Sequence, residues 1–537
     1  MLLKLAASLL GGSAAYLILK AVYAELVSPL RSLPGPRSTH WFFGNLKELM
    51  EVPEDGTLIE NWVQKYGHTF KIHLPFGRSG VFTSDTRAIH HFLSHPELYE
   101  LPPSTRQTLR SIVGPGLLVA KGDAHKQQRK IMNPAFGAPQ VRDLTEIFTA
   151  TSIQLRDIWA AEATKNGGVA RVEILSWLSK ATLDIIGLAG FNYKINALGA
   201  ENHDAPDELA NAFEEVFKAE TTIGLISGLR SLFPVLRRLS MAQDRVTAEA
   251  QATMMRIGRQ LLTEAKREIR ENGTFAPGHA RDLLTLLVRA NTSKDIPAHQ
   301  RLSDEDVIAQ VPTFLVAGHE TTSTAVTWAL FALTQNIPAQ SRLRDELLGV
   351  STDNPTMDEL NALPYLECVV RESLRLYAPV IGTSRVAVRD DVVPLSAPII
   401  DVKGNVHETL RIPKGTIVPI PILTLNRDID IWGSNVMEFV PERWETPPAN
   451  ANSIPGVWGH VLTFLGGPRS CIGFRFSLIE TKALIFTLVR AFEFELAVPS
   501  EEIASRKEMS AIVQRPVVLT DEAAGYQMPL LVKPVGQ

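Results

Sequence analysis

The hydrophobic pattern of the chain is mainly helical. Apolar residues recur at helical spacing in three long stretches: 140–190, 205–270 and 303–336. A further strongly apolar segment, 477–492, predicts a helix near the C-terminus. Short runs with the pattern of strands or of a strand and a turn are fewer: 68–74, 79–83 and 410–416. The pattern therefore predicts a mainly α fold with a minor β component.

The N-terminal residues differ in composition from the rest. Leu5 to Leu19 is apolar or small, and Lys4 and Lys20 flank it. About 20 apolar residues cross a bilayer, and this run reaches that length if Lys20 extends to the interface. A cleaved signal peptide is the alternative. No small-x-small cleavage site is evident, so we expect a membrane anchor over 1–27.

Next comes Leu-Pro-Gly-Pro-Arg, a stiff sequence that ends any helix and predicts a proline-rich hinge over 28–37. No later segment is long or polar enough to divide the chain, so residues 38–537 are expected to form one domain. The net charge of −4 gives no indication of nucleic-acid binding. The chain has only two cysteines, Cys368 and Cys471, which favours a reducing compartment for this domain.

The ten residues that end at Gly473 contain the most specific motif. They read F-x-x-G-x-R-x-C-x-G, with Phe464, Gly467, Arg469, Cys471 and Gly473 at the fixed positions. An isolated cysteine in a glycine-rich turn is usually just buried. This spacing, however, resembles the haem-ligand loop of the cytochrome P450 family. The resemblance implies that Cys471 binds the iron of heme b as a thiolate, which favours O–O cleavage.

A second element, Ala-Gly-His-Glu-Thr-Thr, ends at Thr322 and resembles the family's A/G-G-x-D/E-T-T/S motif. It lies in a segment that opens with a capping box at Ser303 and is apolar all round, as a core helix is. Glu320 in such a helix could pair with a distant base. The resemblance instead implies that Thr321 and Glu320 relay protons to dioxygen. Pro312 is expected to kink or loosen the helix.

A third element is Glu372-Ser-Leu-Arg375, whose i, i+3 spacing places both side chains on one helix face. Alone, such a pair is weak evidence, since a surface ion pair contributes less than about 1 kcal/mol. The surrounding sequence resembles the whole K-helix signature of the family, and Pro-Glu-Arg443-Trp resembles its P-E-R-F/W element. The resemblance implies a Glu–Arg–Arg network that holds the loop behind the haem.

The two haem propionates require cations or donors. By resemblance, the candidates are Arg469, Arg385, Arg129 and His125. His125 departs from the family, which has tryptophan at that position, so a solvated helical histidine is the alternative. Lys126, Lys130 and Arg475 would lie near the proximal face, where positive charge attracts an acidic reductase.

The resemblance implies the cytochrome P450 fold preceded by an N-terminal anchor helix. It also implies a haem-thiolate monooxygenase in the endoplasmic reticulum membrane, with its catalytic domain facing the cytosol. Electrons would come from NADPH through NADPH-cytochrome P450 reductase, a separate flavoprotein, and one oxygen atom of O₂ would be inserted into a lipophilic substrate. The segment 122–136 looks like basidiomycete enzymes of secondary metabolism, which favours a terpenoid substrate.

Family position also suggests the lining of an apolar pocket, with 109–119 as its roof. The lining residues would be Phe314, Val316, Ala317, Val380, Ile381 and Thr383. A fatty-acid or alkane hydroxylase is the alternative within the class. An isomerase or dehydratase with the same fold is a second alternative, although such enzymes often lack the distal threonine. A non-enzymatic haem-binding membrane protein is a third.

Overall fold

The computed structural model describes residues 12, 16, 19–20, 22–51, 57–199, 207–209, 211–212, 242–272, 282–292, 297, 301–506 and 513–536. Most of the predicted anchor, 1–27, lies outside these residues. Among the described residues, one helix is long and apolar enough to span a bilayer, Ile174–Phe191. That helix is mostly buried inside the protein and packs in its core.

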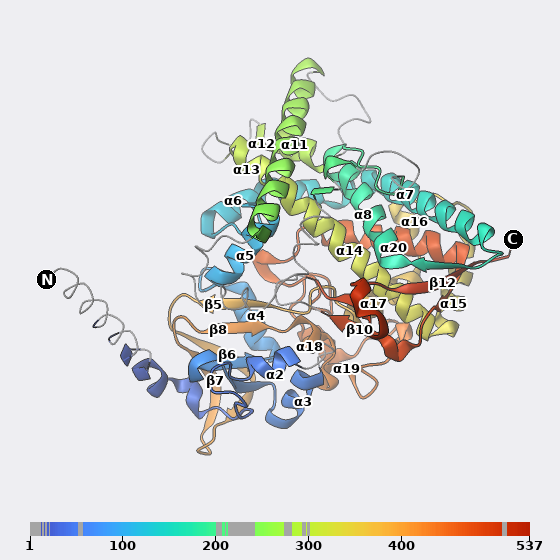
Figure 1. The fold of residues 1–537 in the computed structure, drawn as a ribbon. Coiled ribbons are helices and arrows are strands. Elements are labelled where there is room, and N and C mark those ends of the chain that lie inside the picture. The colour runs from blue at the N-terminus through green and yellow to red at the C-terminus, as the bar shows by residue number, and fades with distance from the viewer. Residues whose placement is uncertain are drawn as a thin grey trace.

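Helices dominate the fold, as predicted (Figure 1). The α-helices are α2 (Leu46–Glu51), α3 (Thr57–Tyr66), α4 (Thr86–Ser94), α5 (Pro103–Val113), α6 (Gly122–Met132), α7 (Ala138–Lys165), α8 (Ile174–Phe191), α11 (Ala242–Asn272), α12 (Leu283–Thr292), α13 (Asp304–Ile308), α14 (Gln310–Gln335), α15 (Ile337–Leu348), α16 (Met357–Asn361), α17 (Pro364–Leu376), α18 (Ile422–Asn426), α19 (Ile429–Trp432) and α20 (Phe474–Ala491). Short 3₁₀ turns include η3 (Asn133–Phe136), η7 (Pro441–Trp444) and η9 (Gly467–Arg469).

The strands form small antiparallel sheets. They are β1 (Thr69–His73), β2 (Ser79–Thr83), β3 (Tyr99–Glu100), β4 (Ala170–Glu173), β5 (Thr383–Ala387), β6 (Asp391–Ile400), β7 (Val406–Ile412), β8 (Ile417–Ile420), β9 (Phe492–Leu496), β10 (Ile503–Arg506), β11 (Arg515–Val518) and β12 (Pro529–Pro534). Their orders are β1-β2, β3-β5-β8, β4-β12-β9, β6-β7 and β10-β11. The predicted strands at 68–74 and 79–83 are thus the paired β1 and β2, with Thr69 opposite Thr83.

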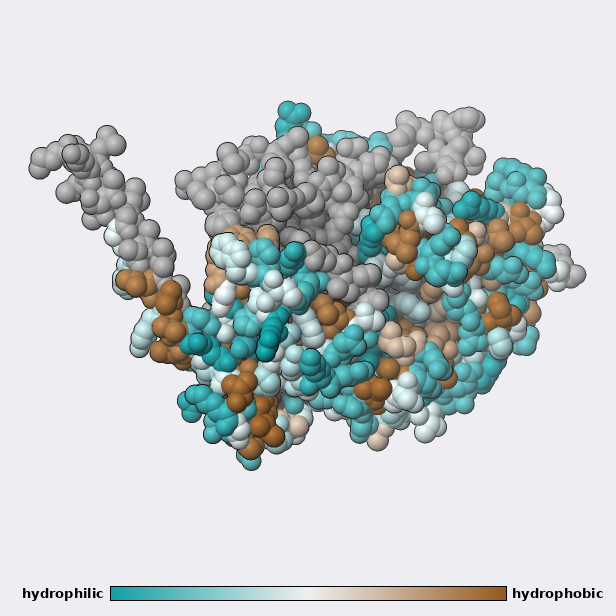
Figure 2. Space-filling view, turned by 60° about the horizontal axis from the view of Figure 1, so that its bottom comes forward, coloured by the Kyte–Doolittle hydropathy of each residue, from teal (hydrophilic) through white to brown (hydrophobic). Residues whose placement is uncertain are grey.

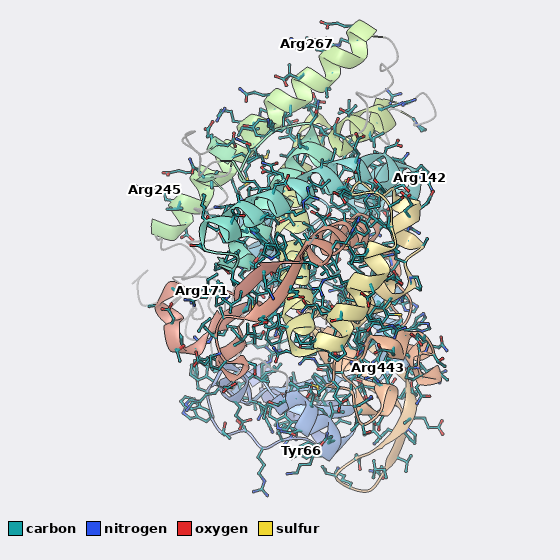
Figure 3. The ribbon with its side chains drawn as sticks, turned by 90° about the vertical axis from the view of Figure 1, so that its right-hand side faces the viewer. Tyr66, Arg142, Arg171, Arg245, Arg267 and Arg443 are labelled. Atoms are coloured by element: carbon teal, nitrogen blue, oxygen red, sulfur yellow. The ribbon has the colours of Figure 1, made fainter. Side chains whose placement is uncertain are left out.

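The sheet β4-β12-β9 packs against the long helices α7 and α14, whereas β6-β7 lies at the opposite end of the molecule from α11 (Figure 1). In Figure 3, Arg267 of α11 lies at the top, and Tyr66 of α3 lies at the bottom. Helix α14 runs through the middle, between these two ends (Figure 1). It packs closely against α8: a Cβ added to Gly318 of α14 would lie only 2.9 Å from the side chain of Ile186 in α8. Glycine at this position therefore allows the two core helices to approach each other.

Two of the predicted helical stretches each contain two helices in the structure. The stretch 140–190 forms α7 and α8, which β4 separates, because residues 166–169 leave the helix and β4 pairs with the C-terminal β12. The stretch 303–336 forms α13 and α14, with a break at Ala309. Pro312 explains this break, since it has no N–H to donate to the carbonyl of Ile308. The predicted capping box at Ser303 is confirmed, with Asp306 as its partner. Of the predicted helical stretch 205–270, most of the first half lies outside the described residues.

Candidate active site between the distal helix and the cysteine loop

A cavity of about 890 Å³ lies in the interior of the protein, between α14 and the loop that carries Cys471. All six residues predicted to line the pocket line this cavity: Phe314, Val316, Ala317, Val380, Ile381 and Thr383. The predicted roof, 109–119, contributes Leu109, Val113, Leu117 and Leu118. The cavity wall also includes Cys471 and Thr321, so it joins the two halves of the predicted site.

The cysteine loop holds its shape through backbone hydrogen bonds. The N–H of Cys471 donates to the carbonyl of Phe464 at 2.8 Å. Gly467 adopts a φ of 69°, and a Cβ there would lie 2.3 Å from the carbonyl oxygen of Leu93 in α4. A glycine is therefore required at this turn. The loop presents the Cys471 side chain to the cavity rather than to the core.

Protonation of the Cys471 thiol depends on opposing influences. Burial raises its pKa above the ordinary value, and a hydrogen bond from the backbone of Gly473 and the positive charge of Arg129 oppose this shift. Arg129 donates to the carbonyl of Ser470 at 2.6 Å, which fixes this guanidinium beside the loop. Both partners favour the thiolate, the form that binds a metal ion.

Four predicted basic residues gather at one side of the cavity: Arg129, His125, Arg385 and Arg469. Burial and the neighbouring Arg469 lower the pKa of Arg385 to about 10, and burial with Arg469 and Arg129 lowers that of His125 to about 4. His125 is buried and neutral, so the solvated alternative is wrong. The Nε of Arg469 is buried without a hydrogen-bond partner among the described residues.

This cluster is suited to an anionic ligand. Buried guanidinium groups that repel one another are costly unless an anion neutralises them. Arginine binds carboxylates through two parallel N–H donors, and a neutral imidazole can supply one further donor. The donor set therefore fits the two propionates of heme b, and Cys471 in the same cavity fits its iron.

Helix α14, the distal helix of this site, exposes a short segment to the cavity. Residues around it are buried, but Ala317 is exposed and Gly318 and Thr321 are partly exposed, all within the cavity wall. The hydroxyl of Thr321 donates to the carbonyl of Ala317 at 2.6 Å. Thr321 is therefore held by its own helix with its side chain at the cavity surface.

Glu320 combines the two features considered from the sequence: it pairs with a distant base, and it lies at the cavity where a proton relay is expected. It lines the cavity, and it also forms an ion pair with Arg515 of β11, whose Nε donates to Oε1 at 2.7 Å. Both side chains are buried. Burial raises the pKa of Glu320 above its usual range, and Arg515 opposes this shift. The adjacent His319 is neutral, because burial lowers its pKa to about 3, and it pairs with Ser179 of α8 at 2.6 Å.

The residues of the predicted Glu372 network come together in the structure, and none of them lines the cavity. Arg375 donates to both carboxylate oxygens of Glu372 at 2.8 and 2.9 Å, and Arg443 donates at 3.3 Å. Figure 3 labels Arg443 in η7, on the lower part of the molecule. Trp444 adds a donor at 2.9 Å, which sequence reasoning did not identify. Glu372 and Arg375 are fully buried, so this pair is unlike a surface ion pair.

Sequence reasoning missed several residues of the site. Arg515 lies in a C-terminal strand that matched none of the motifs, so no local signal marked it as the partner of Glu320. The ring of Phe136 in η3 makes an edge-to-face contact with the ring of Phe314, with 5.3 Å between the ring centroids, and Phe136 forms part of the cavity wall. Leu49, Leu58 and Ile59, near the N-terminus, extend the lining toward α2 and α3.

Comparison with known proteins agrees with this geometry. The family described as Cytochrome P450 matches residues 33–519. Cytochrome P450 monooxygenase 128 of Postia placenta is 52% identical over 97% of this chain and 95% of its own length. Cytochrome P450 monooxygenase 205 of the same fungus is 50% identical over 94% and 93%. Cytochrome P450 monooxygenase claP of Ampulloclitocybe clavipes is 33% identical over 96% of each chain. The chain belongs to the cytochrome P450 family and is an oxidoreductase of the monooxygenase type.

Proposed function

We propose that the protein hydroxylates or epoxidises a lipophilic substrate, using O₂ and electrons that a flavoprotein reductase transfers from NADPH. The observation that carries this proposal is the composition of the cavity. Its lining includes Cys471 and a cluster of guanidinium groups, together with Thr321 and Glu320. A thiolate, an anion-binding site and a proton relay therefore share one largely apolar space.

Heme b, when bound through Cys471, supplies the activation of dioxygen. The residues of the chain bind and orient it: Arg385, Arg469 and Arg129 would hold its propionates, with His125 as a further donor. Burial of these groups excludes bulk water and strengthens each charge–charge interaction. The Glu372 network holds the loop and does not touch the cavity.

Proton supply is assigned to Glu320 and Thr321. Burial raises the pKa of Glu320, and a carboxyl group with a raised pKa is better suited to hold and then deliver a proton. Thr321 has a hydroxyl at the cavity surface, where it can accept one hydrogen bond while donating another. We assign Glu320 the role of proton donor and Thr321 the role of positioning the receiving oxygen.

A terpenoid is the proposed substrate class, with fatty acids or alkanes as the second candidate. Apolar and aromatic side chains line the region between α5 and α14, including Leu109, Val113, Leu117, Phe314 and Val316. Such a surface favours compact hydrocarbon skeletons with few polar groups. Conversion of a panel of terpene precursors and fatty acids by cells that express a reductase tests this choice.

The protein is proposed to be held at the endoplasmic reticulum membrane by residues 1–27. Apolar residues in the described part of this segment are at least half exposed: Tyr16, Leu19, Val22, Tyr23, Leu26 and Val27. Figure 2 shows such apolar residues along the projection at the left. Glu25 accepts a hydrogen bond from the backbone of Ser79 at 2.9 Å, which attaches the end of this segment to β2. Microsomal fractionation of the full chain against one that lacks 1–27 tests the anchor.

The exposed cations Lys126, Lys130 and Arg475 support docking of an acidic reductase near the cysteine loop. Two substitutions test the proposed chemistry. Cys471→Ala should abolish the thiolate-type ferrous–CO spectrum, and retention of that band would contradict the ligand assignment. Thr321→Ala should consume NADPH but release peroxide instead of product. Turnover that needs no NADPH would favour an isomerase or dehydratase, and a spectral shift on ligand binding without oxygen consumption would favour a non-enzymatic haem protein.

A further inference from the structure

The interior of α20 contains a carboxyl group that the proposed chemistry does not use. Glu480 is 0% exposed, and no hydrogen bond of standard length and angle reaches either of its carboxyl oxygens from the described residues. An isolated buried carboxylate is strongly disfavoured, and such a group remains neutral instead. In agreement, burial raises the pKa of Glu480 well above its usual range, and only the Thr322 hydroxyl opposes this shift.

The surroundings connect Glu480 to the active-site cavity. Ser477 lies one helical turn earlier in α20, on the same face of the helix as Glu480. Its hydroxyl lies 3.2 Å from the hydroxyl of Thr322 in α14, the residue that follows Thr321. Both Ser477 and Thr322 line the cavity, whereas Glu480 does not. Thr322, which interacts with the Glu480 carboxyl group, therefore connects that group to the cavity wall.

Two neighbouring hydroxyls do not fix their own orientation, because each can act as donor or acceptor. A neutral carboxylic acid supplies an O–H donor and a C=O acceptor, and it can therefore select one arrangement of the pair. We propose that Glu480 is a positioning residue that donates its O–H to the Thr322–Ser477 hydroxyl pair. This contact leaves one hydroxyl hydrogen of the pair directed at the cavity, where it is a second hydrogen-bonding group beside Thr321.

Substitutions at Glu480 separate this role from the alternatives. Glu480→Gln keeps the shape, one donor and one acceptor, so it mimics a neutral acid and should behave like the wild type. Glu480→Leu removes the donor but has no polar group to bury, so the fold should remain stable. Thr487→Val is the matched control, because Thr487 is a buried residue of the same helix whose hydroxyl also lacks a described partner and lies outside the cavity wall.

The direct test is infrared spectroscopy of the substrate-free holoenzyme at neutral pH. Wild type minus Glu480→Gln should show the C=O band of a protonated carboxylic acid, and Thr322→Val should shift that band. Absence of the band, or a carboxylate band in its place, would overturn the proposal. A band that Thr322→Val leaves unchanged would equally overturn it, because the acid would then make no contact with the pair.

The second readout rests on the proposed function and measures product formed per NADPH. Glu480→Leu should lower this ratio several-fold with an intact ferrous–CO spectrum, while Glu480→Gln and Thr487→Val keep it. Equal ratios in all variants would contradict the positioning role. If the wild type itself turns over no substrate, the proposed function fails, but the infrared result still decides whether Glu480 is a neutral donor.

Discussion

Replacing Glu372 by alanine should destabilise the protein far more than replacing a nearby surface glutamate. The Glu372 carboxylate accepts hydrogen bonds from Arg375, Arg443 and Trp444 side chains and from the backbone N–H of Val440 at 3.1 Å. Without it, the guanidinium of Arg375, which is 0% exposed, remains charged in the interior. Backbone carbonyls of Asn426 and Val436 still accept from it, at 3.0 and 2.8 Å, but carry no net charge.

The size of the effect follows from burial. Breaking a buried ion pair by removing one partner costs about 3–5 kcal/mol, and the total free energy of unfolding of a protein is about 5–15 kcal/mol. Glu442 provides the control, since it precedes Arg443 in η7 and accepts hydrogen bonds from Arg342 at 2.9 Å and from Tyr365 at 2.7 Å. Its side chain is 42% exposed, so Glu442→Ala should cost only about 0–1 kcal/mol.

The assay compares thermal unfolding of the two variants by tryptophan fluorescence, together with the haem recovered per protein. Glu372→Ala should unfold at a much lower temperature and retain little haem, because the network holds the segment next to the cysteine loop. Glu372→Gln should give an intermediate result, since it keeps one acceptor but loses the charge. Equal stability and haem content in Glu372→Ala and Glu442→Ala would refute the reasoning that burial makes this network strong.

Three other perturbations give distinct outcomes. Gly467→Ala should lower the unfolding temperature and the haem content, because the added Cβ would meet a backbone carbonyl of α4. Gly459→Ala is the control and should have no effect, because the space around Gly459 is open. Equal effects of the two substitutions would contradict this reasoning. The pKa of His68 is raised mainly by Asp428, whose carboxylate lies 3.3 Å from the ring, so the stabilisation from His68 is present below about pH 6.5 and is lost as pH rises through the raised value. The difference in unfolding temperature between wild type and His68→Gln should therefore be larger at pH 6 than at pH 9, and a pH-independent difference would count against it. Arg515→Met leaves Glu320 without its cation, so the loss of stability should grow as pH rises and the carboxyl ionises; the double variant with Glu320→Gln should remove this pH dependence, and its persistence would point to another group.

Local motifs were the part of the site that the sequence could specify. A helix places residues i and i+3 on one face, so pairing of Glu372 with Arg375 follows from spacing alone. The capping box at Ser303 is equally local and is present in the structure. The turn at Gly467 could be expected from its glycine, but its cause, the backbone of α4, is remote in the sequence. Such local features can be predicted from the sequence because a few neighbouring residues determine them.

Contacts between distant segments could not be predicted in this way. The break between α7 and α8 arises where β4 pairs with β12, near the other end of the chain. The burial of His125 depends on the packing of α6 against the cavity wall, and the sequence around it would equally suit an exposed helix. Hydrophobic periodicity reports which face of an element is buried, but it does not report which element covers that face.

Glu320 shows why the two interpretations of a buried acid need not exclude each other. The ion pair with Arg515 makes the carboxylate tolerable inside an apolar helix, and burial at the same time keeps its pKa above the usual range. Val513, which lines the cavity, lies two residues before Arg515. The cation that controls the charge of Glu320 therefore belongs to the segment that also forms part of the substrate wall. A ligand that contacts Val513 would act on the same backbone that positions Arg515, so the shape of that ligand would influence the proton donor role proposed for Glu320.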